Sequence, residues 1–171
     1  MSPQEEQAAL FEQAALPHLG AAFNLARWLM KNDADADDVI QDAYVRALKS
    51  FGQFRGNSSK TWLLAIVRNC CFTALHKGKP AHFTDQTAEP ADQGPDPEAE
   101  LIRTTDARRL NAALEALVPE FREVFVLREL EGLSYKEIAS VSSLPIGTVM
   151  SRLSRARRDL RRLLGQPEVK L

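Results

Sequence analysis

The chain of 171 residues has two cysteines and three histidines, which limits its capacity for metal or disulfide chemistry. Cys70 and Cys71 are adjacent, so on a helix their side chains would point about 100° apart and could hardly pair or chelate one metal. The histidines, at positions 18, 76 and 82, have no spacing from the cysteines that is typical of a metal site. We therefore predict no metal site, and two core cysteines whose protected thiols argue against a redox sensor.

Long apolar runs are also missing, because no stretch approaches the roughly 20 residues that would span a bilayer. The N-terminal segment carries acids where a secretory signal has bases, and no apolar core with a cleavage site follows it. Neither a phosphate-binding glycine loop nor a paired catalytic acid and base is visible. With 44% hydrophobic and 26% charged residues, the sequence predicts a soluble cytoplasmic protein that does not insert into a membrane, is not an enzyme and needs no cofactor.

The net charge of the whole chain is only −1, but positive and negative residues are not mixed evenly: some stretches lack charge of one sign altogether. Residues 84–100 contain six acids and no base, whereas residues 55–79 contain five bases and no acid. Residues 150–162 hold six arginines and one acid. This segregation indicates separate faces for separate partners.

No convincing alternation of apolar and polar residues occurs, which leaves no candidate β-strand. Apolar residues instead recur with the 3.6-residue period of a helix in residues 16–30, 39–51 and 62–75, and again from residue 110 onward. In the second of these segments the expected buried stripe includes Leu48. The pattern therefore predicts an all-α fold.

The stretch 84–100 differs from its surroundings, with three prolines, one glycine and no large aliphatic residue. It could not bury enough apolar surface to offset the entropy of ordering. We therefore predict two small helical domains, residues 1–80 and 101–165, joined by a flexible acidic linker, residues 81–100.

A helix-turn-helix is predicted in the C-terminal domain. Gly132 is placed to end one helix, and Ser134 with Glu137 three residues later has the pattern of a capping box for the next. Pro145 suits the first turn of a further helix, where its missing amide would be unpaired anyway. The buried stripe of that last helix is expected to comprise Ile146, Val149, Leu153, Ala156, Leu160, Leu163 and Leu164.

The other side of this last helix is polar and strongly basic, with arginines at positions 152, 155, 157, 158, 161 and 162. Arginine can bridge guanine edges or bind phosphates, so such a helix suits the major groove of DNA. A solvated arginine-rich helix is the alternative, but it would favour interleaved glutamates for pairing, which this helix lacks.

The segment "VPEFREVFVLRELEGLSYKEIASVSSLPIGTVMSRLSRARRDLRRLL" resembles region 4 of the extracytoplasmic-function group of bacterial sigma factors, most specifically in "LRELEGLSYKEIA" and "GTVMSRLSRAR". The resemblance covers residues 106–164 and implies that the last helix binds the -35 promoter element. It places Met150, Ser151, Ser154 and Arg155 at the reading surface. The candidates that it implies for further -35 contacts, mostly to phosphates or at the periphery, are Arg128, Tyr135, Lys136, Thr148, Arg152 and Arg157. Methionine at 150 departs from the basic residue often found there.

The N-terminal half carries a second resemblance. "DADADDVIQDAYVRAL" is similar to the region 2 segment that binds the clamp helices of the largest subunit of RNA polymerase. The residues that this likeness assigns to core-polymerase binding are Asp37, Asp38, Gln41, Asp42 and Arg46. Acids near a helix N-terminus also interact favourably with the helix dipole, which is the structural alternative for this cluster.

"FRGNSSKTWLLAIVRNCCFTALHK" resembles the part of region 2 that recognises and melts the -10 element. Capturing unpaired bases needs a basic track, apolar surfaces and a polar residue that reads a base edge. The residues implied for -10 contacts are Arg55, Lys60, Arg68 and Asn69, and the loop "GQFRGNSSK" would frame the base pocket. We expect Trp62, on the apolar stripe, to pack in the core rather than stack on a base. The segment after Asn69 departs from the family pattern, so the base preference cannot be transferred.

Taken together, the resemblance implies a sigma factor whose partners are RNA polymerase core enzyme, promoter DNA and an anti-sigma factor. It also implies that the linker passes near the polymerase active-site channel. Two rival functions remain open: a helix-turn-helix regulator that binds duplex DNA without core polymerase, and a decoy that binds only an anti-sigma factor or response regulator. The arginine-rich face speaks against the decoy, which would not need it.

Overall fold

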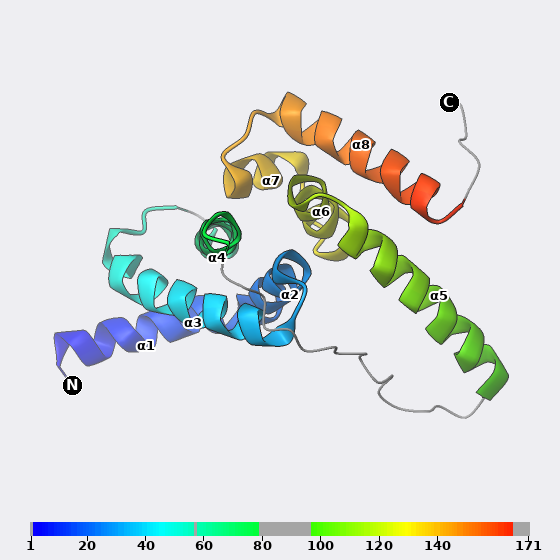
Figure 1. The fold of residues 1–171 in the computed structure, drawn as a ribbon. Helices are drawn as coiled ribbons and strands as arrows, with labels where there is room; N and C mark the ends of the chain where they lie inside the picture. The colour runs from blue at the N-terminus through cyan, green and yellow to red at the C-terminus, as the bar shows by residue number, and fades with distance from the viewer. Residues whose placement is uncertain (1, 57, 79–96, 166–171) are drawn as a thin grey trace.

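The computed structural model describes residues 2–56, 58–78 and 97–165, with side chains described outside 97–103. In this part of the chain every regular element is helical, as predicted (Figure 1). No described helix is long and apolar enough to cross a membrane. The elements are α1 (Pro3–Ala15), η1 (Leu16–His18), α2 (Leu19–Met30), α3 (Asp33–Ser50), η2 (Phe51–Gln53), α4 (Ser59–His76), α5 (Pro97–Ala116), α6 (Pro119–Phe125), η3 (Val126–Leu130), α7 (Tyr135–Ser142) and α8 (Ile146–Leu163).

Helix α1 was not predicted from the sequence, although its first residues carry a clear signal. The side chain of Ser2 accepts a hydrogen bond from the Glu5 amide, and the Glu5 carboxylate accepts one from the Ser2 amide. This capping box, followed by Pro3 at the first helical position, starts the helix. The helix expected over residues 16–30 begins instead at Leu19, because Pro17 lies in a short 3₁₀ turn that precedes it.

Three helices, α2, α3 and α4, form the body of the N-terminal half. The side chain of Asn32 caps α3 by accepting from the Asp35 amide at 2.7 Å, and Ser58 caps α4 by accepting from Thr61 at 3.2 Å. Such caps satisfy amides that would otherwise lack partners at a helix start. The buried side chains include Leu25, Leu29, Val39, Ala43, Leu63, Leu64 and Val67.

The predicted helix-turn-helix is confirmed in α7 and α8. Gly132 has a φ of +70°, a conformation that favours glycine, and it ends the helical segment that α6 begins. Ser134 and Glu137 form the expected capping box at the start of α7. Pro145 precedes the first residue of α8 as its N-cap, and its carbonyl accepts from the amides of Thr148 and Val149.

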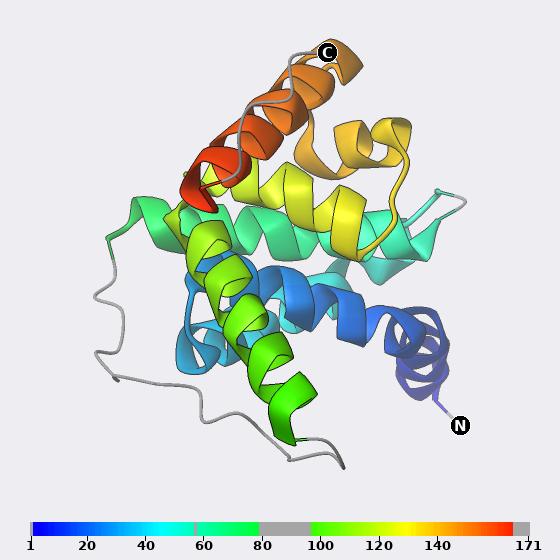
Figure 2. The ribbon, with the colours of Figure 1, turned by 90° about the vertical axis from the view of Figure 1, so that its right-hand side faces the viewer.

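The two halves pack directly against each other along α4. Figures 1 and 2 show α4 between α2 and α3 on one side and α6 and α7 on the other. Leu64, Val67 and Cys71 of α4 belong to the same buried cluster as Val124 and Ile138 of the C-terminal half. A second cluster joins α5 to α8 through Ala113, Leu114, Leu117, Ala156 and Leu160. Both predicted domains thus contribute residues to the first of these clusters.

The predicted linker lies mostly outside the described residues, as residues 79–96 are not described. Helix α5 begins at Pro97, inside the stretch 81–100 that was assigned to the linker. Proline is favoured at a first helical position because its fixed φ fits the helix and its missing amide would lack a partner there.

Candidate nucleic-acid interface

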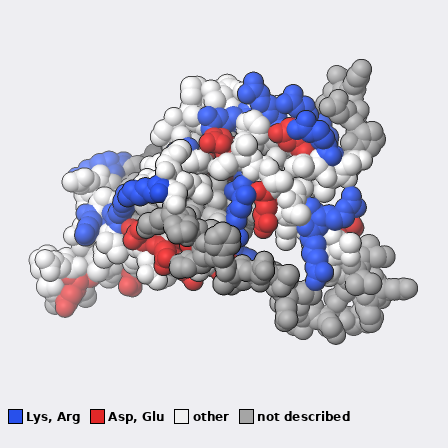
Figure 3. Space-filling view, viewed as in Figure 1, with Lys and Arg blue, Asp and Glu red and all other residues white. Residues whose placement is uncertain are grey.

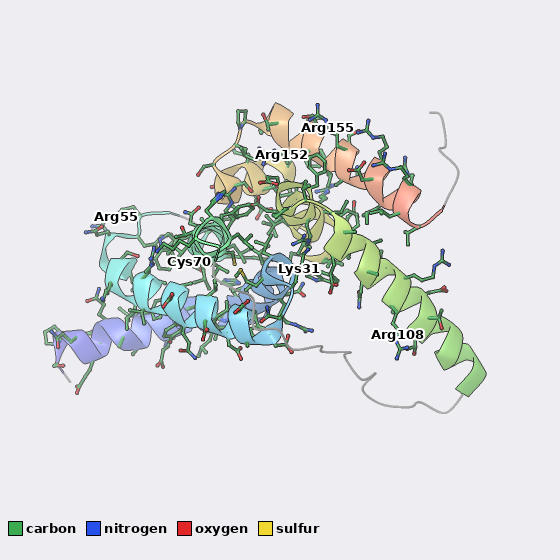
Figure 4. All side chains as sticks on the ribbon, in the orientation of Figure 1. Lys31, Arg55, Cys70, Arg108, Arg152 and Arg155 are labelled. Carbon is green, nitrogen blue, oxygen red and sulfur yellow. The ribbon has the colours of Figure 1, made fainter. Side chains whose placement is uncertain are left out.

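The basic side of α8 faces away from the core. Val149, Leu153, Ala156 and Leu160 are buried as predicted, and this fixes the opposite face toward solvent. Met150, Ser151, Ser154 and Arg155 are all exposed, while Thr148, Arg152 and Arg157 are partly buried. Lys and Arg side chains accordingly line α8 in Figure 3, and Figure 4 labels Arg152 and Arg155 on this helix.

Two members of the predicted α8 stripe are wrong, although Leu164 at its end packs on the second cluster. Ile146 and Leu163 are 45% and 48% exposed, although the sequence pattern placed them in the core. At about 100° per residue both positions lie at the edges of the stripe formed by Val149, Leu153, Ala156 and Leu160, so their side chains turn partly toward solvent. Exposed Ile146 adds an apolar side chain beside Met150 at the N-terminal end of the basic face.

Three of the predicted -35 contacts meet where η3, α7 and α8 join. Arg128 donates to the carbonyl of Leu133 at 2.8 Å, and its guanidinium lies 4.6 Å from the ring centroid of Tyr135. Arg157 is paired with Glu129, and the hydrogen bond to Glu129 raises the pKa of the arginine. Lys136 lies exposed on α7. Arg128 and Arg157 therefore brace the helix-turn-helix as well as lying at its surface.

The five residues predicted to bind polymerase are brought together on α3. Asp37, Asp38, Gln41, Asp42 and Arg46 are all exposed on its outer side. Val45 and Leu48 are also exposed there, at 49% and 38%, although the sequence placed Leu48 in the buried stripe. Apolar side chains surrounded by polar ones are typical of a protein interface. Sequence reasoning missed Val45, because its position off the apolar stripe gave no signal of a role.

A small cleft of about 80 Å³ opens between α3 and α4 beside this acidic face. Asp38, Asp42 and Arg46 line one side, and Cys70 and Lys77 lie on the other. Figure 4 labels Cys70 between these helices. Both cysteines are buried, as predicted from the apolar stripe.

The buried cysteines should resist alkylation in the native chain. Burial raises the pKa of Cys70, and it raises the pKa of Cys71 to about 12, so the reactive thiolate is scarce at ordinary pH. We expect iodoacetamide at pH 8 to modify neither thiol in the time that it consumes a free cysteine, and to modify both in urea. Mass spectrometry would follow the reaction, and rapid labelling of the folded chain would contradict the expectation.

A second hollow, of about 530 Å³, lies at the N-terminal end of α4, where the sequence predicted a base pocket. Phe54, Arg55 and Trp62 line it, and the rings of Phe54 and Trp62 are 5.0 Å apart. Arg55 donates to the carbonyls of Gly52 and Phe54, which holds it at the rim. Trp62 is half-buried: it packs on the core, as expected, and it also lines the hollow.

The other predicted -10 residues lie at different places along α4. Asn69 is exposed about two turns after Trp62, and Lys60 is half-buried near the start of the helix. Arg68 instead turns toward the C-terminal half. Its Nε lies 2.7 Å from Oε1 of Glu123, and its guanidinium lies over the ring of Phe72 at 4.2 Å. In this conformation Arg68 is not part of an open basic track with Arg55 and Lys60.

Two charged residues at the junction of the halves were missed. Arg122 and Glu123 of α6 are both 0% exposed. Arg122 donates to five carbonyls, those of Trp28, Leu29, Leu114, Glu115 and Leu117. Glu123 accepts from Arg68 and, at 2.8 Å, from the hydroxyl of Ser142. The available signal was their place in the mostly apolar segment "FREVFVL", in which Val124, Val126 and Leu127 are buried as well.

Family models match both halves of the chain. The model of sigma-70 region 2 matches residues 15–80, and the model of sigma-70 region 4 matches residues 107–160. Together they contain α2 to α4, the second half of α5, all of α6 and α7, and most of α8.

Named relatives and a solved structure agree with these matches. The chain is 32% identical to an ECF RNA polymerase sigma factor, SigE, of Mycolicibacterium smegmatis, over 91% of this chain and 65% of the relative. It is 36% identical to the RNA polymerase sigma-H factor of Pseudomonas aeruginosa, over 76% and 73%. The sigma factor RpoE of Bartonella quintana, solved in complex with the anti-sigma factor NepR, superimposes with a TM-score of 0.73 at 30% identity, covering 92% of this chain and 98% of that one.

Proposed function

Because the chain belongs to the extracytoplasmic-function group of sigma-70 factors, we propose that it binds core RNA polymerase and directs it to a subset of promoters. The observation that carries this proposal is that one short chain has two surfaces, each suited to a different form of DNA. An aromatic hollow beside α4 suits unpaired bases, whereas the arginine face of α8 suits a duplex groove.

Region 2 would supply the contacts to polymerase and to the -10 element. The exposed acids of α3, with Val45 and Leu48 among them, fit a basic protein surface such as the polymerase clamp. The hollow lined by Phe54 and Trp62 would accept a base from the non-template strand, with Arg55 at its rim and Asn69 further along α4. Opening the duplex would be driven by tighter binding to melted than to closed DNA, so the chain itself need catalyse no reaction.

Region 4 would dock α8 in the major groove of the -35 element. Ser151, Ser154 and Arg155 can donate to base edges, and Met150 with Ile146 can contact thymine methyl groups. Four basic residues would contact phosphates: Lys136, Arg152, Arg128, which is held by the Leu133 carbonyl, and Arg157, which is held by Glu129.

The remaining parts of the proposal concern partners and place. A protein that acts on RNA polymerase and promoter DNA works in the cytoplasm. An anti-sigma factor is the expected regulator, as for the relative from Bartonella quintana that was solved in such a complex.

Transcription in a purified system tests this function. With core polymerase and a promoter library, initiation should require the chain, and Asn69→Ala should reduce it. Asp42→Lys should lower affinity for the core enzyme about tenfold or more, because it reverses a charge on the α3 face. Fluorescence titration of labelled chain with core enzyme would measure this.

The matched control is Asp106→Lys, which reverses an exposed acid on α5 and should leave core affinity unchanged. Equal losses for the two variants would remove the α3 face from the proposal. Binding to duplex DNA without core enzyme, and no initiation on any fragment, would instead favour the helix-turn-helix regulator.

A further inference from the structure

One charged pair crosses from the -10 face of region 2 into region 4. The guanidinium of Arg68 on α4 meets the carboxylate of Glu123 on α6 through two contacts, Nε to Oε1 at 2.7 Å and Nη2 to Oε2 at 3.5 Å. The Arg68 side chain is 18% exposed, and that of Glu123 is fully buried. Arg68 also donates to the side-chain oxygen of Asn69 at 3.4 Å. Two residues expected to contact DNA are therefore tied to this pair.

Each charge of the pair depends on the other while the halves are packed together. A carboxylate withdrawn from water is costly unless a cation and further hydrogen bonds compensate it. Arg68 supplies the cation, and the hydroxyl of Ser142 supplies another hydrogen bond within region 4. If region 4 moves away, Glu123 returns to water and Arg68 is released.

Region 4 also approaches the rest of the -10 face. Ser140 of α7 lines the hollow formed by Phe54 and Trp62. The pKa of Glu137, on the same helix, is lowered mainly by its hydrogen bonds with Ser134, and the nearby charge of Lys60 adds to the effect. The predicted -10 residues Arg68 and Lys60 thus each lie near an acid of region 4.

We propose that Glu123 is an internal competitor for DNA, which occupies Arg68 in the closed chain and releases it when region 4 separates from region 2. The carboxylate takes the place that a phosphate of the melted strand would occupy. This autoinhibitory contact rests on the proposed function for the role of Arg68, but its effect on the shape of the free chain does not.

The variant Glu123→Gln tests the proposal without polymerase. Glutamine keeps the size of the side chain and an oxygen for Ser142, but it leaves Arg68 without its counter-charge. Small-angle X-ray scattering of the full chain should show a larger radius of gyration. Binding of a short fluorescent single-stranded DNA of mixed sequence should tighten about tenfold, because more of the chain is in the binding-competent state. The dependence of log affinity on log salt should steepen by about 0.7, the contribution of one more phosphate contact in a single strand.

Two further variants separate the competitor from a general loss of structure. Glu120→Gln removes the same charge from the same helix without touching Arg68, and should change neither measurement. Arg68→Gln breaks the same pair from the other side, so it should open the chain equally but leave DNA binding no tighter than in the unaltered chain. Unfolding followed by circular dichroism would confirm that all three variants are folded.

An unchanged radius of gyration for folded Glu123→Gln would overturn the proposal. So would opening that brings no tighter binding, since Glu123 would then not be covering a DNA contact. Failure of the unaltered chain to initiate transcription with core polymerase would count against the proposed function. Because that assay is separate from the scattering and DNA-binding measurements, the two failures can be distinguished.

Discussion

Replacing Arg122 with alanine is expected to lower the free energy of unfolding by about 3 to 5 kcal/mol. The guanidinium is completely buried, and burial lowers the pKa of this arginine. Its five hydrogen bonds satisfy carbonyls near the C-terminal ends of two helices, α2 and α5, where a positive charge is favourable. Alanine would leave these carbonyls without their donor and create a cavity. Urea unfolding followed by circular dichroism would measure the loss.

Two comparisons make the result specific to the buried guanidinium. Arg122→Lys should recover little of the stability, because one ammonium group cannot reach acceptors spread over two helices. Arg108→Ala, on the exposed side of α5, should change the free energy of unfolding by no more than about 0.5 kcal/mol. If Arg122→Ala were as mild as Arg108→Ala, the hydrogen bonds to α2 and α5 would contribute no net stability.

The elements that the sequence predicted well are those determined by nearby residues. The capping box of Ser134 and Glu137 lies within one helical turn, and the conformation of Gly132 follows from its lack of a side chain. The apolar stripes of α3, α4 and α8 likewise follow from helical periodicity. Helix α1 escaped prediction because its apolar pattern is weak, with Phe11 and Ala15 as its buried residues.

Periodicity also has a physical limit. It shows which side of a helix is apolar, but not how much of that side the neighbouring helices cover. Leu48, Ile146 and Leu163 continue their stripes in sequence, yet each stands at the edge of its stripe and is exposed, whereas Leu164, at the C-terminal end of α8, packs on the core. At Leu48 this exposure coincides with the acidic face predicted to bind polymerase. An exposed apolar residue at the edge of a stripe can therefore mark a binding surface that periodicity alone would conceal.

The junction between the halves could not be predicted from local rules. Arg68 and Glu123 are separated by 55 residues, and nothing in either segment identifies the other as its partner. Their pairing depends on how region 4 packs on α4, which is a property of the assembled core. The sequence assigned Arg68 to DNA as part of a basic track in the segment that resembles the -10 element reader, whereas the closed structure shows the carboxylate with which DNA would have to compete.

The largest functional effect is expected at Arg155. The buried stripe of α8 turns this side chain outward, among Ser151 and Ser154 on the N-terminal part of the helix. A bidentate contact from arginine to guanine is worth about 1 to 3 kcal/mol of discrimination, so Arg155→Ala should weaken a cognate -35 element about 5- to 150-fold. It should also make one position of that element tolerant of all four bases. Promoter binding by the holoenzyme, measured across -35 variants, would show both effects.

Arg162→Ala is the matched control, because it removes the same side chain from the same face about 10 Å further along α8. Arg162 is 73% exposed and is paired with Asp159, so it is suited to a phosphate contact rather than a base. Its loss should weaken binding to every promoter by the same modest factor. The slope of log affinity against log salt should become shallower by about one, the contribution of one phosphate contact. If Arg155→Ala behaved in this uniform way, Arg155 would contact the DNA backbone, and the base-reading surface would lie elsewhere on α8, with Ser151 and Ser154 as the next candidates.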